Sequence, residues 1–123
     1  MSDHVRVART EGRVTITLDR PGKANALTAE MLDAVARAAG TADAPVLVIT
    51  GAGGVFSAGA DLEAARAGLA TSAAWERASG AIAGFPGLSI AALNGPCAGG
   101  AMGMMLACDL RVAVPGARLF YPV

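Results

Sequence analysis

The sequence predicts an α/β domain built on a mostly parallel sheet. One observation is the order of a half-buried strand, an amphipathic helix and the continuous apolar run PVLVIT over 45–50. Another is that the strand-then-helix unit returns further along, with a buried-looking strand over 89–93. The 123 residues are enough for one compact domain with a modest core.

The N-terminal elements follow from local patterns. Residues 14–18 alternate apolar and polar side chains, which is typical of a half-buried strand. Residues 5–7 precede them across Glu11 and Gly12, so an antiparallel hairpin is expected. Apolar residues at helical spacing then predict a helix that begins after the N-cap Thr28 and ends at Gly40, a natural residue for a C-terminal cap.

The apolar run over 45–50 is expected to be a strand buried on both faces of the sheet. Asp61 can cap a short helix that reaches about Ala67, and a second helix is expected over 72–83. The remaining expected elements are a strand over 89–93, a helix from Gly99 to near Cys108 and a strand over 110–114.

Composition and charge disfavour a nucleic-acid-binding protein and indicate that part of the surface is covered. Ten basic and ten acidic residues cancel without forming a basic stripe, which disfavours nucleic-acid binding. Hydrophobic residues make up 54% of the chain and charged residues only 16%, which is apolar for a small domain. We therefore expect a partner, or the rest of a longer protein, to cover part of its surface.

The long uncharged stretch between Arg77 and Asp109 does not predict a membrane span, because Pro and Gly residues interrupt it. The polar N-terminus has no secretory signal. Cys97 and Cys108 show no metal-binding spacing, so no metal site is predicted. Reduced cysteines and a missing signal together predict a cytoplasmic protein.

Two glycine-rich segments, SAGAD (57–61) and AGGAMG (98–103), each follow a buried strand and lead into a helix. Parallel strands would bring both segments to one edge of the sheet, where two backbone N–H groups could converge on one oxygen as an oxyanion hole. The second would lie at a helix N-terminus, where the dipole adds positive potential. The alternative is that these glycines only permit tight turns. A dinucleotide site is disfavoured because Phe56 occupies the position of the third glycine.

Three motifs resemble the enoyl-CoA hydratase/isomerase family, which has the crotonase fold: RPGKANAL (20–27), GVFSAGADL (54–62) and NGPCAGGAMGMMLACDLRVA (94–113). The resemblance implies a spiral of β-β-α units, a homotrimer or hexamer, and an acyl-CoA thioester as substrate in fatty-acid or acyl-CoA metabolism. Coenzyme A is then part of the substrate, and no bound cofactor is expected. Family members are about twice as long, so residues 1–123 are expected to form the N-terminal part of a single crotonase-like domain.

By position, the resemblance assigns the oxyanion-hole amides, and hence the catalytic role, to Ala60 and Gly100. It implies that the backbone around 24–26 and 57–60 holds coenzyme A, with Arg20 and Lys23 near its phosphates. Asp61 is expected to cap its helix as well. The expected substrate-binding set is Lys23, Ala24, Ala26, Ser57, Ala58, Ala60, Asp61, Gly99 and Gly100.

The chain departs from the family at both acid–base positions. The two glutamates that hydratases of this family use are replaced here by Gly103 and Val123. Two classes therefore stay open. One is a lyase or isomerase that works with another group, such as Tyr121, Cys97 or a residue beyond this chain. The other is a non-catalytic acyl-CoA-binding or assembly subunit.

Overall fold

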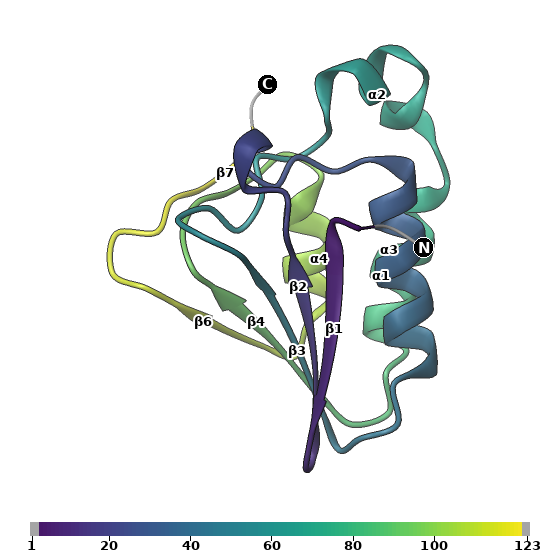
Figure 1. Cartoon of the computed structure of the whole chain (residues 1–123), viewed down its shortest axis with the longest axis vertical. Coiled ribbons are helices and arrows are strands. Elements are labelled where there is room, and N and C mark those ends of the chain that lie inside the picture. Colours follow the sequence, from purple (N-terminus) through teal and green to yellow (C-terminus); the bar gives the residue numbers. More distant parts are fainter. Residues whose placement is uncertain (1–2, 122–123) are drawn as a thin grey trace.

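A computed structural model describes residues 3–121 and has a five-stranded sheet in the order β1-β2-β3-β4-β6 (Figure 1). The first two strands pair antiparallel as the predicted hairpin, and every later pair is parallel. The α/β class with a mostly parallel sheet is thus confirmed. The strands of this sheet are β1 (Val5–Thr10), β2 (Arg13–Leu18), β3 (Val46–Gly51), β4 (Leu88–Leu93) and β6 (Leu110–Ala113).

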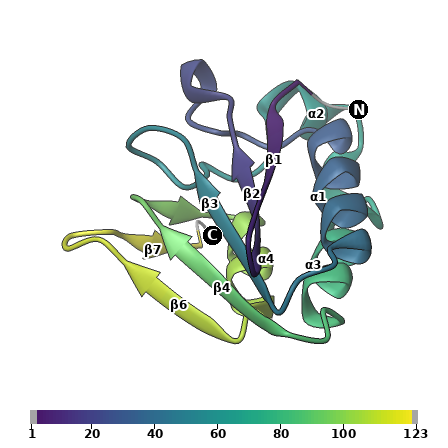
Figure 2. The same cartoon turned by 60° about the horizontal axis from the view of Figure 1, so that its bottom comes forward.

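Helices cover one side of this sheet, as Figures 1 and 2 show for α1 (Ala29–Thr41) and α3 (Ala74–Ala83). Helix α4 (Ala101–Ala107) packs beside α3. Two very short strands pair parallel in a second sheet. The remaining elements are the 3₁₀ turns η1 (Pro21–Lys23) and η2 (Leu69–Thr71), helix α2 (Leu62–Arg66), β5 (Cys97–Ala98) and β7 (Leu119–Phe120).

The core lies between the sheet and these helices. Leu47 and Ile49 of β3 are fully buried, and they alternate with Val46 and Val48, which are only half-buried. The prediction that this strand is buried on both faces is therefore wrong for this chain. The physical reason is that the helices of residues 3–121 cover one face only, so the apolar side chains of the other face keep contact with solvent.

Helix α1 begins where the sequence predicts it and ends later. The Thr28 hydroxyl accepts a hydrogen bond from the Met31 amide at 3.2 Å, which confirms the N-cap. The helix, however, runs through Gly40 to Thr41, so the predicted C-terminal cap is wrong. The Thr41 hydroxyl donates to the Arg37 carbonyl at 2.8 Å, which satisfies that carbonyl without a left-handed glycine.

The loops that follow β2, β3 and β4 gather at one end of the sheet (Figure 1). Their approach is close enough to require glycine at one point. A Cβ atom on Gly95, in the loop after β4, would lie 1.9 Å from the carbonyl oxygen of Gly54, in the loop after β3. No side chain fits at Gly95, so the backbones of the two loops touch there. Beside this contact, the Asn94 side-chain amide donates a hydrogen bond to the Val55 carbonyl at 3.0 Å.

This contact predicts a sharp difference between two glycines of neighbouring loops. Gly95→Ala forces backbone against backbone and should lower the free energy of unfolding by about 1–3 kcal/mol. Gly54→Ala is the matched control, because a Cβ there meets nothing within 4 Å. Urea denaturation of both variants measures the difference, and equal stabilities would show that the loops are not packed in this way.

Candidate active site

A backbone bridge joins the first motif to the second and sets the direction of one amide. The Leu27 amide donates to the Gly59 carbonyl at 2.7 Å, and the Asp61 amide donates to the Leu27 carbonyl at 2.8 Å. In such a parallel bridge the residue between the two partners, Ala60, turns its own N–H to the opposite side. Among residues 3–121, this N–H has no hydrogen-bond acceptor.

A second bridge joins the second motif to the third. The Ala98 amide donates to the Ser57 carbonyl at 3.0 Å, and the Gly99 amide donates to the Phe120 carbonyl of β7 at 3.1 Å. The next amide belongs to Gly100, the residue that precedes α4. This amide, too, lacks an acceptor within the part of the chain that the structure describes.

Ala60 and Gly100 line the same cavity, whose volume is about 490 Å³. The two residues come from loops about 40 positions apart, and the backbone bridges bring them to one wall. The lining of the cavity therefore includes two residues, each preceded by a glycine, whose amides have no acceptor among residues 3–121. Its other lining residues are Ala70, Thr71, Ser72, Trp75, Glu76, Gly103 and Tyr121.

The indole ring of Trp75 forms part of the wall beside Gly100. A Cβ atom on Gly100 would lie 2.7 Å from ring atom Cζ3, so only glycine lets the ring approach this closely. The ring is held in place, because its Nε1 donates a hydrogen bond to the Leu69 carbonyl at 2.8 Å. Glycine is therefore required at position 100 for the packing of the Trp75 ring, and it also leaves the amide unobstructed.

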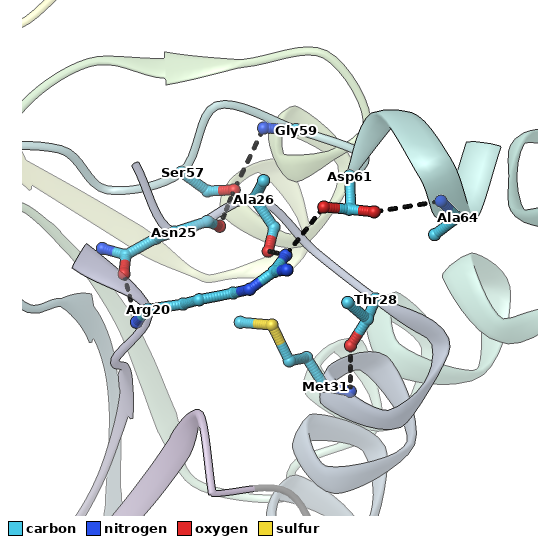
Figure 3. Close-up of polar contacts among 9 residues, drawn as sticks. All are labelled: Arg20, Asn25, Ala26, Thr28, Met31, Ser57, Gly59, Asp61 and Ala64. Carbon is cyan, nitrogen blue, oxygen red and sulfur yellow. Dashed lines mark hydrogen bonds and ion pairs between the residues drawn. The ribbon is translucent and has the colours of Figure 1, made fainter. Parts of the chain in front are cut away.

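Arg20 and Asp61 form an ion pair that ties the first loop to the start of α2 (Figure 3). An Arg20 Nη1–Asp61 Oδ1 distance of 2.9 Å defines the pair, and Arg20 also donates to the Ala26 carbonyl at 3.1 Å. The second Asp61 oxygen accepts from the Ala64 amide at 3.0 Å, which confirms the predicted helix cap. The Arg20 guanidinium is thus paired within the protein, and its expected place near the coenzyme A phosphates stays a prediction.

Asn25, in the first loop, is a structural residue that sequence reasoning missed. Its amide nitrogen donates to the carbonyls of Ala52 and Val55, and its side-chain oxygen accepts from the Arg20 amide at 2.7 Å. Asn25 is fully buried and has a φ of 54°, a left-handed conformation that asparagine tolerates better than most residues. The sequence feature that could have indicated this role is an asparagine inside a short loop.

Ser57 belongs to the same network rather than to the surface. Its hydroxyl donates to the Asn25 carbonyl at 2.8 Å and accepts from the Gly59 amide at 3.1 Å (Figure 3). The residue is fully buried, so its side chain serves the loop, and the predicted contact of this segment with coenzyme A concerns its backbone. It supports the loop that carries Ala60.

The remaining predicted binding residues lie together at the surface of these loops. The Ala58 amide donates to the Ala24 carbonyl at 3.0 Å, which holds the first two motifs side by side. Ala58 and Lys23 are exposed, and Ala24 and Ala26 are half-buried. Gly99, half-buried with a φ of 59°, belongs to the third motif and precedes Gly100.

The acid–base alternatives differ in their surroundings. Cys97 is fully buried, and burial raises the pKa of its thiol to about 11, so the thiol stays protonated and weakly nucleophilic near neutral pH. Tyr121 is exposed and lines the cavity. Gly103 also lines it, and a Cβ there would meet nothing within 4 Å. Val123 lies outside the described residues.

Comparison with known proteins identifies the family. The model for "Enoyl-CoA hydratase/isomerase" matches residues 8–122. A mevalonyl-coenzyme A hydratase of Beauveria bassiana is 44% identical over 126 residues, which cover 89% of this chain and 45% of that protein. A 4-chlorobenzoyl coenzyme A dehalogenase of an Arthrobacter species is 37% identical over 122 residues, which cover 89% of this chain and 44% of that protein.

A solved structure gives the same result for the fold. A putative enoyl-CoA hydratase from Thermobifida fusca, solved in complex with acetoacetyl-CoA, has a TM-score of 0.84 and 29% identity over 94% of this chain and 52% of that one. The chain therefore belongs to the enoyl-CoA hydratase/isomerase family and has its crotonase fold. It spans about half the length of the curated relatives it matches. Within residues 3–121, no helix is long and apolar enough to cross a membrane.

The Arg20–Asp61 pair predicts a dependence of stability on pH. The Ala64 amide and then the Arg20 guanidinium lower the pKa of Asp61 below its usual value of 3.8. The stabilisation is therefore present above pH 3.8 and is lost as the pH falls through the lower pKa of the folded protein. Thermal unfolding at a series of acidic pH values should show this loss in the wild type and less of it in Asp61→Asn.

Asp43→Asn is the matched control for this series, since Asp43 is exposed and forms no ion pair within residues 3–121. It should keep the acid dependence of the wild type. If Asp61→Asn and Asp43→Asn change the acid dependence equally, the ion pair and helix cap do not stabilise the folded state as inferred.

Proposed function

We propose that this protein binds an acyl-CoA thioester and polarises its carbonyl between the backbone N–H groups of Ala60 and Gly100. One observation carries the proposal: both amides lack an internal acceptor among the described residues, and both residues line the 490 Å³ cavity. Buried or half-buried amides are rarely left without a partner, so an unmatched pair at a cavity wall points to a ligand oxygen. The names of the relatives support a CoA ester as that ligand.

The chemical benefit of two such donors is greatest when negative charge develops on the oxygen. Removal of a proton next to a thioester carbonyl moves charge onto that oxygen as an enolate. A preorganised N–H donor is worth about 2.7–4 kcal/mol for such a charge, because the donor needs no reorientation. Ala60 meets this condition, since its direction is set by the bridge to Leu27.

The loops beside Ala60 suit the coenzyme A part of the substrate. Exposed Ala58 and half-buried Ala24 and Ala26 offer backbone groups without bulky side chains. Lys23, at the end of η1, is exposed and forms no ion pair in the described part of the chain. It can meet a phosphate, whereas Arg20 is already paired. Coenzyme A enters as part of the substrate, and no other cofactor is proposed.

The assembly and extent of the protein are proposed from the family. The apolar face of the sheet and the half-length match to relatives support residues 1–123 as the N-terminal part of one crotonase-like domain. A homotrimer or hexamer, located in the cytoplasm, is the assembly we propose for the protein that contains it.

An optical measurement tests the oxyanion hole directly. The absorption of a conjugated thioester such as cinnamoyl-CoA moves to longer wavelength when its carbonyl is polarised, and we expect this shift on binding. Replacing the Ala60 amide by an ester, through lactic acid at position 60, removes the N–H and keeps the methyl group. The shift should shrink, and affinity should fall about threefold to tenfold, as for one lost hydrogen bond.

The matched control is the same amide-to-ester exchange at Ala58, whose N–H bonds to Ala24 within the fold. This variant should lose stability but keep the spectral shift once folded. An unchanged shift in the Ala60 ester variant, or no binding of cinnamoyl-CoA by the wild type, would refute the proposed site.

A second candidate is a non-catalytic acyl-CoA-binding or assembly subunit, favoured by the glycine at 103 where hydratases of the family carry an acid. Incubation with crotonyl-CoA followed by product analysis separates the two. An enzyme should form product above the uncatalysed background, whereas a binding subunit should show the spectral shift of a bound thioester with no turnover.

A further inference from the structure

Among residues 3–121, Glu76 is the only acidic residue that lines the cavity of Ala60 and Gly100. It lies in the first turn of α3, on a helix whose active-site role the sequence does not indicate. It is exposed, and its carboxylate forms no ion pair or hydrogen bond in the described part of the protein. The lining of one cavity thus holds an unpaired carboxylate together with two unpaired amides.

The first turn of α3 is held firmly against the rest of the site. The Ser72 hydroxyl accepts from the Ala74 amide at 3.1 Å, and Trp75 bonds to the Leu69 carbonyl. The side of α3 opposite Glu76 is buried, through Ala74, Ala78 and Ile82. Since the Trp75 ring also packs against Gly100, the backbone of the neighbouring Glu76 has a defined place relative to that amide.

The wall of the cavity on α4 leaves room for a group from α3. Gly103 contributes no side chain, and the space where its Cβ would point contains no atom within 4 Å. A substrate in this cavity would therefore meet a carboxylate from α3 and none from the described part of α4.

We propose that Glu76 is the catalytic base that exchanges the α-proton of the bound acyl thioester. This inference rests on the proposed function, because the thioester must first bind in the oxyanion hole. The Glu76 carboxylate takes a proton from the α-carbon, the C–H bond breaks, and its electron pair moves to the thioester oxygen as an enolate held by Ala60 and Gly100. The proton then returns from Glu76 to the same carbon or to a conjugated one, so no further reactant is consumed.

Deuterium exchange measures this step without knowledge of the full reaction. Butyryl-CoA is incubated with the full 123-residue chain in D₂O, and incorporation of deuterium at the α-carbon is followed by mass spectrometry or NMR. Glu76→Gln should lower the exchange rate by about 100-fold or more, the usual contribution of a general base. Its cinnamoyl-CoA spectral shift should be unchanged, because both amides remain.

Two further variants make the result specific. Glu63→Gln is the matched control, because it carries the same substitution at an exposed helical glutamate outside the cavity and should exchange like the wild type. Tyr121→Phe removes the other ionisable side chain of the cavity lining among residues 3–121 and tests whether the tyrosine, rather than Glu76, transfers the proton.

The outcomes separate this inference from the proposed function. Absence of cinnamoyl-CoA binding by the wild type overturns both. A normal spectral shift with no exchange in the wild type, or with equal exchange in Glu76→Gln, overturns the role of Glu76 alone. Loss of exchange in Tyr121→Phe with full exchange in Glu76→Gln assigns the proton transfer to the tyrosine and also overturns it.

Discussion

The candidate site depends on the parallel bridge between Leu27 and Ala60. Two backbone hydrogen bonds on either side of Ala60 hold the second loop against the first and leave the Ala60 amide directed away from both. A register shift of one residue would instead turn the Gly59 or the Asp61 amide toward the cavity. The geometry of the site is thus a matter of backbone register, which no side-chain substitution at Ala60 would alter as long as the bridge remains.

Buried polar side chains keep that register in place. Asn25 and Ser57 are both fully buried, and each side chain bonds to backbone atoms of its own loop and of the neighbouring loop. The Arg20–Asp61 pair joins the first loop to helix α2 with little exposure of either side chain. A buried donor or acceptor that loses its hydrogen-bond partner costs about 1–3 kcal/mol. These residues therefore oppose a shift in backbone register between the loops more strongly than exposed contacts would.

The fold brings these loops together on a scaffold that is covered on one side. All three motif loops leave the same end of the parallel strands, which explains why residues far apart in sequence share one cavity. The same arrangement leaves the half-buried valines of β3 on the face away from the helices. The high apolar fraction of the sequence and the match to only about half of each relative agree with this one-sided core.

The sequence alone determined the local elements and the family. Alternation, helical spacing and cap residues such as Thr28 act through neighbouring residues, so they can be recognised without knowledge of the fold. The glycine-rich segments over 57–61 and 98–103 also indicated one shared site, because parallel strands end at one edge, and the family resemblance then assigned Ala60 and Gly100 within them. Only the tertiary structure decided which groups are free: it paired Arg20 with Asp61, buried Ser57 and Cys97, and placed Glu76 on the cavity wall. These outcomes depend on contacts between segments distant in sequence, and no local pattern encodes such contacts.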